Sequence, residues 1–277
     1  MAKSIKNKLN TSPIGIFDSG IGGLTVANAI HKILPNEQLI YFGDIAHFPY
    51  GEKSADSIKY YALRISDFLI KQNCKMIVIA CNTASSVAYQ IVKQQVGDKA
   101  MVVSVIEPVV SRVAALYKHG KIGVIATKGT IKSDVYAKRL KELNQSLQVA
   151  SLATPLLAPM IEEGFFNNKI SKTVINSYLE RPKLKKIDAL ILACTHYPLI
   201  RPEIEDYYKQ KVKIIDSAEI VAESVFNLLA DKGLLNTAKT VKSKFYVSDF
   251  TESFANSTKI FYKGKIKLER FPLWENE

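Results

Sequence analysis

Two of the three cysteines stand in tetrapeptides of similar character, Ala80-Cys81-Asn82-Thr83 and Ala193-Cys194-Thr195-His196. Each tetrapeptide ends an apolar run, MIVIA or ALILA, that is typical of a buried strand. Because the two thiols follow strands in similar surroundings, we expect them to face one cleft. Two facing thiols with no other obvious reactive group predict chemistry with two opposed proton carriers.

A thiol is mostly protonated near neutral pH, so a cysteine base needs a neighbour that holds or accepts its proton. The candidates are Asp18, which ends the first predicted strand, and His196, which lies two residues after Cys194. Asp18 could instead cap the helix that follows, and His196 could be a surface histidine. Cys74 precedes its strand, outside this pattern, and is interpreted as structural.

The loop Asp18-Ser19-Gly20-Ile21-Gly22-Gly23 follows a strand, so a dinucleotide site must be considered. Asp44 ends the second strand, where a ribose-binding acid would stand. However, Thr25 occupies the place of the third glycine of the dinucleotide motif, and Asp18 would repel a pyrophosphate. Exposed N–H groups and Ser19 suit a single carboxylate better. Tyr50, in a predicted turn, could add a hydroxyl and an N–H group.

The chain carries a doubled pattern of strands. Four apolar segments that begin near Ile14, Gln38, Met76 and Met101 recur between 108 (122 − 14) and 113 (189 − 76) residues later. Amphipathic helical segments separate them, among them one before Pro35, one capped by Ser54, and others over 107–117 and 217–229. This alternation predicts an α/β fold with two similar parallel-sheet α/β domains related by internal duplication.

The predicted domain organisation places the active site in the cleft between the two domains. Residues 1–12 are expected to be a flexible tail, 13–105 together with 217–277 the first α/β domain, and 106–216 the second. The last segment departs from the repeat: KFYVSDF and IKLERF read as short strands that could pack back on the first domain. Ligands of open α/β sheets bind at the carboxyl ends of the strands, where every motif named above lies.

The amino-acid composition further restricts the class of protein to which this chain can belong. The 277 residues are 47% hydrophobic and 23% charged, which is typical of a globular protein. No apolar run is long enough to span a bilayer, and the basic N-terminus lacks the apolar part of a signal peptide, so a cytoplasmic protein is expected. The net charge of +12 is spread along the chain and favours a solvated surface over nucleic-acid binding. No metal-binding spacing of cysteines and histidines is present.

Taken together, these motifs resemble glutamate racemases of the cofactor-independent aspartate/glutamate racemase family. The matching segments are IGIFDSGIGGLTV, YFGDIAHFPYG, IACNTAS, VIEP, APMIEEG and LACTHYPL, in that order over residues 14–200. The segment Ile45-Ala46-His47-Phe48 departs from the family pattern, in which a hydroxyl residue and often an arginine are expected.

The resemblance implies inversion of glutamate at Cα without a cofactor: one thiolate removes the proton and the other thiol protonates the opposite face. By position, Cys81 and Cys194 match the catalytic cysteines, Asp18 the acid that assists the first, and His196 the histidine that assists the second. Matches to residues that hold the substrate are Ser19, Tyr50, Gly51, Asn82, Thr83 and Thr195, together with Asp18 and His196. Asp44 and Glu162 match further acidic residues near the site.

The resemblance also implies D-glutamate supply for peptidoglycan in a bacterium, and a homodimer is compatible with the family although no interface is indicated. Three alternatives stay open at this point. The same fold could racemise aspartate or a related amino acid. The glycine-rich loop could belong to a nucleotide-dependent oxidoreductase, and a two-lobed protein could be a non-catalytic ligand binder or a DNA-binding regulator.

Overall fold

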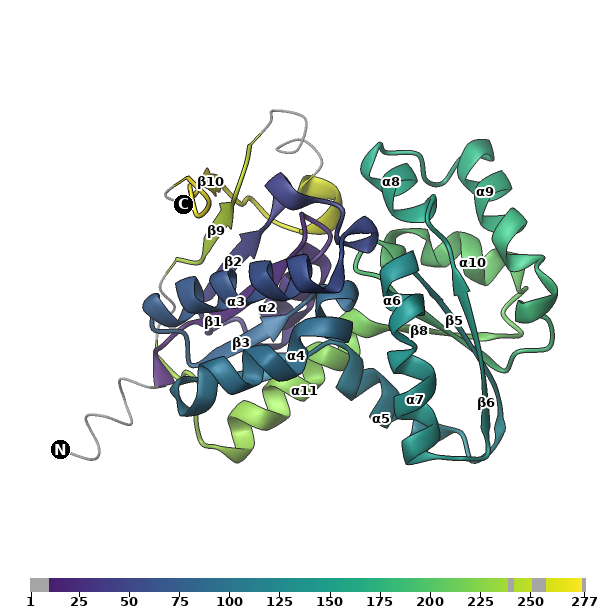
Figure 1. Ribbon diagram of the computed structural model, residues 1–277, viewed down its shortest axis with the longest axis horizontal. Helices are drawn as coiled ribbons and strands as arrows, with labels where there is room; N and C mark the ends of the chain where they lie inside the picture. Colours follow the sequence, from purple (N-terminus) through teal and green to yellow (C-terminus); the bar gives the residue numbers. More distant parts are fainter. Residues whose placement is uncertain (1–9, 239–241, 251–257, 276–277) are drawn as a thin grey trace.

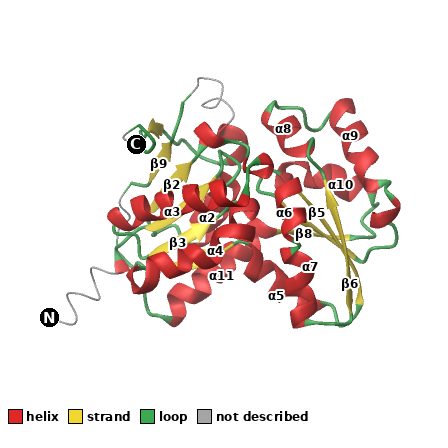
Figure 2. Cartoon of the chain, in the orientation of Figure 1, coloured by secondary structure: helices red, strands yellow, loops and turns green. Residues whose placement is uncertain are grey.

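The computed structural model describes residues 10–238, 242–250 and 258–275. Within these ranges the strands form two separate parallel sheets, each with helices packed on it (Figures 1 and 2). The larger sheet has the order β10-β9-β2-β1-β3-β4 and the smaller sheet has the order β6-β5-β7-β8. The expected α/β fold with two parallel sheets is therefore confirmed.

The strands of the larger sheet are β1 (Ile14–Asp18), β2 (Leu39–Gly43), β3 (Met76–Ile79), β4 (Met101–Ser104), β9 (Lys244–Val247) and β10 (Leu268–Arg270). Those of the smaller sheet are β5 (Gly120–Ala126), β6 (Leu147–Ala153), β7 (Ala189–Ala193) and β8 (Lys213–Asp216). The helices are α2 (Leu24–Ile33), α3 (Ala55–Lys71), α4 (Asn82–Val96), α5 (Ile106–Leu116), α6 (Lys128–Ser133), α7 (Val135–Leu143), α8 (Leu157–Glu162), α9 (Lys169–Leu179), α10 (Arg201–Tyr207) and α11 (Ser217–Asp231).

The internal duplication is visible in the strand order. Strands β2-β1-β3-β4 of the larger sheet lie in the same order as β6-β5-β7-β8 of the smaller sheet, and every neighbouring pair is parallel. The four strand pairs matched in the sequence are therefore structural equivalents. Strand β3, which precedes Cys81, occupies the same place as β7, which precedes Cys194. Both thiols consequently stand at the carboxyl end of the third strand of a half.

The larger sheet is covered on both faces, as its apolar strands require. Helices α3 and α4 pack on one face with Phe17, Ile77 and Ile79, while α2, α5 and α11 pack on the other with Ile14 and Ile16. The predicted cap of α3 is present, since Ser54 Oγ accepts a hydrogen bond from Ser57 N at 3.1 Å. The apolar core between the larger sheet and α2, α5 and α11 is continuous with the core of the smaller sheet.

The C-terminal segment packs on the larger sheet, as its two short strand patterns suggested. Strand β9 pairs with β2 over Ile40–Gly43 and Lys244–Val247, and β10 adds a further parallel strand outside β9. Both strands lie at the outer edge of that sheet, near the C-terminus (Figure 1). The smaller sheet gains no such strands within the described residues. The exact domain boundaries given above stay a prediction.

The predicted tail of residues 1–12 lies mostly outside the described residues, which begin at Asn10. No helix among the described residues is long and apolar enough to cross a membrane.

Candidate active site

Both predicted thiols line one buried cavity between the two sheets. Its lining comes from strand ends and helix starts of both halves: Ser19, Phe48, Pro49, Tyr50, Gly51, Cys81, Asn82, Thr83, Thr127, Ala158, Ala193, Cys194, Thr195 and His196. The cavity volume is about 30 Å³. Besides the two cysteines, seven of the predicted site residues therefore line one cavity, and the site is identified by its lining rather than by its size.

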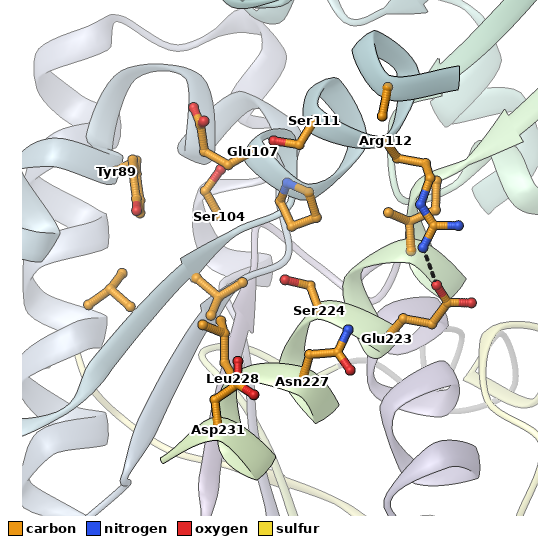
Figure 3. Close-up of a pocket in the computed structure, with 15 residues that line it drawn as sticks. Tyr89, Ser104, Glu107, Ser111, Arg112, Glu223, Ser224, Asn227, Leu228 and Asp231 are labelled. Atoms are coloured by element: carbon orange, nitrogen blue, oxygen red, sulfur yellow. Dashed lines mark hydrogen bonds and ion pairs between the residues drawn. The ribbon is translucent and has the colours of Figure 1, made fainter. Parts of the chain in front are cut away.

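A larger cavity of about 530 Å³ lies between α5 and α11, lined by residues such as Tyr89, Ser104 and Asp231 (Figure 3). Arg112 of α5 and Glu223 of α11 form an ion pair across it. None of the predicted site residues lines this cavity, and no cysteine or histidine lines it either. The chemistry therefore belongs to the small cavity.

Cys81 caps the helix that follows it. Its Sγ accepts a hydrogen bond from Ala84 N at 3.4 Å, and it lies 3.7 Å from Ser19 Oγ. Burial, together with the charge of Asp18, raises the pKa of Cys81 to about 12, against the weaker opposite effect of these two hydrogen bonds. A negative charge on this sulfur is disfavoured, so Cys81 rests as a thiol, which is a proton donor.

Asp18 is completely buried, and its two oxygens have different partners. Oδ2 accepts hydrogen bonds from the N–H groups of Gly20 (3.2 Å) and Gly23 (3.0 Å), and Oδ1 accepts one from Thr195 Oγ1 at 3.5 Å. Asp18 thus orders the loop before α2 and also reaches the other half, while its role as the acid that assists Cys81 stays a prediction. Burial raises the pKa of Asp18 in spite of the nearby His196.

The surroundings of Cys194 are basic rather than acidic. Its Sγ lies 3.7 Å from His196 Nδ1, and His196 Nε2 lies 2.7 Å from Glu162 Oε1. Burial alone lowers the pKa of His196, but hydrogen bonds with Cys194 and Glu162 and the charges of these partners outweigh burial and raise it to about 10. An imidazolium beside Cys194 stabilises negative charge on its sulfur.

In the glycine-rich loop, Gly22 is required by the close contact between the two halves. A Cβ added at Gly22 would lie 2.4 Å from the ring of His196 and 2.6 Å from Thr195 Oγ1. Only glycine therefore lets the loop meet the second half at this point. Two of the N–H groups that seemed available for a substrate carboxylate, those of Gly20 and Gly23, bind Asp18 instead.

Other predicted residues hold the cavity wall. Asn82 Oδ1 accepts a hydrogen bond from the Tyr136 hydroxyl at 2.7 Å, and its buried Nδ2 has no hydrogen-bond partner among the residues that the structure describes. Thr83 Oγ1 meets Thr127 (2.9 Å) and Thr130 (3.2 Å) of the second half. The unpaired amide of Asn82 is a hydrogen-bond donor that a bound ligand can use.

Tyr50 lines the cavity, its part in holding the substrate stays a prediction, and its hydroxyl is engaged within the protein. It donates to Asp44 Oδ2 at 2.6 Å, and Asp44 does not line the cavity. Glu162 also stands behind the cavity, as the partner of His196. These two acids thus contact the cavity wall through Tyr50 and His196, and their role in the reaction stays a prediction.

Sequence reasoning missed Thr127, which lines the cavity and caps α6 with its side chain. The signal that could have found it is the duplication itself. Thr127 follows β5 at the same offset of 108 residues (127 − 19) that relates Ile14 to Ile122, so it is the counterpart of Ser19. Phe48, Pro49 and Ala158 were missed as well, and apolar lining residues carry no comparable signal.

Comparison with known proteins agrees with this geometry. The family model "Asp/Glu/Hydantoin racemase" matches residues 21–225. The glutamate racemase of Chlorobaculum parvum is 43% identical over 258 residues, which is 92% of this chain and 94% of the relative. That of Geobacter metallireducens is 42% identical over 91% of this chain and 93% of its own length.

Solved structures give the same result. The glutamate racemase of Francisella tularensis in complex with D-glutamate superposes with a TM-score of 0.90 at 41% identity, covering 96% of this chain and 99% of that one. The Escherichia coli glutamate racemase in complex with L-glutamate and the activator UDP-MurNAc-Ala has a TM-score of 0.77 at 26% identity, covering 94% and 98%. The chain therefore belongs to the Asp/Glu/Hydantoin racemase family, as an amino-acid racemase of the glutamate racemase type.

Proposed function

We propose that this protein interconverts L- and D-glutamate by moving the Cα proton between Cys81 and Cys194, without a cofactor. The observation that carries the proposal is that both thiols, from equivalent strand ends of two duplicated sheets, line one buried cavity. Inversion at a carbon needs a base on one side and an acid on the other, and two facing halves supply them. Relatives of known activity that act on glutamate support this choice of substrate.

In one direction, Cys194 acts as the base. Its sulfur, with the imidazolium of His196 beside it, takes the proton from Cα and becomes a thiol. The electron pair left on carbon is shared with the substrate carboxylate. Cys81, which rests as a thiol, then gives its proton to the opposite face and becomes a thiolate. The reverse direction exchanges the two roles, so no proton is gained or lost overall.

The charge that develops on the substrate carboxylate needs hydrogen-bond donors that are in place beforehand. The free Nδ2 of Asn82 and the N-terminus of α4, which begins directly after Cys81, are suited to this role. On the second half, Thr195 and Thr127 add hydroxyl groups. Ser19, Gly51 and Thr83 complete the proposed substrate contacts.

In the cell, the proposed reaction supplies D-glutamate for peptidoglycan synthesis in the cytoplasm. Homodimer formation remains a prediction, because within the described residues nothing identifies an interface between copies.

The test is exchange of the Cα proton with solvent. L-glutamate is incubated with the protein in deuterated buffer without added pyridoxal phosphate or metal, and optical rotation and the NMR signal of Cα–H are followed together. We expect racemisation with deuterium in the product, and loss of both in a Cys81→Ala variant. Absence of exchange with glutamate, together with exchange on aspartate, would move the protein to the neighbouring substrate class.

A further inference from the structure

We propose that the C-terminal segment (residues 242–250 and 258–275) is a positioning element of the active site, which holds the Tyr50–Gly51 turn through Asp44 and uses Trp274 and Ser248 as its contact points. This inference rests on the proposed function, because it assigns a role in that reaction to residues outside the cavity. It concerns the part of the chain that has no counterpart in the duplicated pattern.

Asp44 is the centre of the arrangement. It follows β2 directly, is completely buried, and accepts hydrogen bonds from four side chains. Tyr50 (2.6 Å) and His47 (2.9 Å) come from the loop beside it, whereas Ser248 (2.8 Å) and Trp274 Nε1 (2.9 Å) come from the C-terminal segment. A carboxylate removed from water depends on such donors, so half of its hydrogen-bonding set comes from a segment more than 200 residues away.

The C-terminal segment is itself fixed to the sheet at this place. Ser248 N donates to Gly43 O at 3.0 Å, directly beyond the pairing of β9 with β2, and Ser248 Oγ accepts from Ala46 N at 3.0 Å. The ring of Trp274 meets the rings of His47 and Tyr61 edge to face, at centroid distances of 4.8 and 5.5 Å. The indole N–H therefore reaches Asp44 from a ring that neighbouring aromatic groups hold in place.

Asp44 transmits this constraint to the cavity through Tyr50. Burial, followed by the charge of Asp44, raises the pKa of Tyr50 well above its usual value, so its hydroxyl stays a donor to Asp44. Tyr50 and Gly51 line the cavity beside Cys81. On the other side of the turn, a Cβ added at Gly51 would lie 2.9 Å from Thr127 of the second half. The turn is thus held between Asp44 and the opposite half, and its placement sets the wall of the cavity.

The experiment compares wild-type protein with Trp274→Phe at a temperature where both are fully folded. Phenylalanine retains an aromatic ring but removes the N–H donor to Asp44 together with part of the indole ring, so a control for lost packing accompanies it. We expect kcat/KM for glutamate to fall about tenfold, equivalent to about 1.4 kcal/mol in the activation barrier, mainly in kcat. Values of kcat and KM within twofold of wild type would overturn the proposal.

The matched control is Phe271→Leu. Phe271 lies in the same segment and packs on Phe68 and Tyr246, at 4.5 and 5.7 Å between ring centroids, but no hydrogen bond joins it to Asp44. We expect this variant to lower the melting temperature while kcat and KM stay within twofold of wild type. If Trp274→Phe behaves in the same way as Phe271→Leu, the segment only stabilises the fold and the inference is wrong.

A double-mutant cycle with Tyr50→Phe tests the route. If Trp274 acts through Asp44 and Tyr50, adding Trp274→Phe to a Tyr50→Phe protein should lower kcat/KM by clearly less than the tenfold expected for Trp274→Phe alone. The reason is that Tyr50→Phe already removes the hydrogen bond between Tyr50 and Asp44. Full additivity would contradict the route. An inactive wild-type protein would refute the proposed function itself, whereas an active wild type with an unaffected Trp274→Phe variant would refute only this inference.

Discussion

Cys81 and Cys194 follow equivalent strands in two sheets of the same order, yet the side chains around the two thiols differ. Cys81 has Ser19 beside it and the buried carboxyl of Asp18 nearby, which together with burial raises the pKa of Cys81 to about 12. Cys194 has His196, whose other ring nitrogen is bound to Glu162. One half surrounds its thiol with an acid and the other with a base.

This difference separates the contribution of the duplicated sheets from that of the side chains around each thiol. The repeated sheet places two sulfurs, one from each half, in the lining of one cavity. The partners then differ in charge: burial and Asp18 keep Cys81 a thiol, whereas an imidazolium lies beside Cys194. A symmetric pair would have two thiols or two thiolates, and neither state provides an acid and a base at the same time.

The largest expected effect tests whether both thiols are needed despite their different surroundings. Cys81→Ala and Cys194→Ala should each lower kcat for glutamate racemisation at least about 10³-fold, since each removes a general acid or base. Polarimetry in both directions measures this. If either variant keeps more than about a tenth of the wild-type rate, that sulfur is not a proton carrier and the comparison between the halves has no catalytic meaning.

A second pair of variants separates the two environments. Asp18→Asn and His196→Asn should each lower kcat/KM about 10²-fold. Because the two enantiomers of glutamate have equal free energy in water, kcat/KM must stay equal in both directions for every variant. The asymmetry must therefore appear in kcat and KM taken separately, and we expect it to have opposite sense in the two variants. The same sense in both would show that the surroundings of the thiols do not set their roles.

The Glu162–His196 pair gives a smaller effect with a defined pH dependence. Burial lowers the pKa of His196, and its partners raise it to about 10, so the imidazolium is kept up to that pH and lost above it. Glu162→Gln removes one of these partners. We expect kcat/KM to fall about tenfold and its decline at alkaline pH to begin at a lower pH.

Glu163→Gln is the matched control for this test. Glu163 is the neighbouring residue, but it is exposed, and its side chain does not line the cavity. Its pH profile should coincide with that of the wild type. A Glu162→Gln profile that also coincides with the wild type would mean that His196 does not need its carboxylate partner to stay protonated.

Much of this arrangement could be predicted from the sequence. Strand periodicity and the offset of about 110 residues gave both sheets, because buried parallel strands are apolar along their whole length. Cys81, Cys194 and His196 were found because they follow such strands directly. The positions of these residues depend only on neighbouring residues in the sequence, so the sequence pattern predicts them.

The remainder depends on contacts between distant segments. The hydroxyl of Tyr50 donates to Asp44, and two of the other donors to this carboxylate, Ser248 and Trp274, lie 204 and 230 residues further along the chain. Thr127 was missed although its place in the repeat matches Ser19. Hydrogen bonds of this kind follow from how the elements pack, and no spacing in the sequence encodes them.

Substitution of the third cysteine, Cys74, is expected to have the smallest effect on catalysis, because Cys74 lies outside the pair of equivalent strand ends. Cys74 is buried outside the repeat, its Sγ lies 3.0 Å from the position of a Cβ added at Gly15, and burial raises its pKa to about 12. Burial is the cause of this rise, and Cys74 does not line the cavity. Cys74→Ala should leave kcat and KM within twofold of wild type and lower the free energy of unfolding by about 1 kcal/mol, as expected for a small cavity.

Urea unfolding and steady-state kinetics on the same preparation check both values. Burial raises the pKa of Cys81 and of Cys74 alike to about 12, so this number by itself does not mark a catalytic thiol. What separates them is position: Cys81 lines the cavity together with a second thiol, and Cys74 does not. A Cys74→Ala variant that lost racemisation while staying folded would show that burial, rather than the paired strand ends, governs thiol function here.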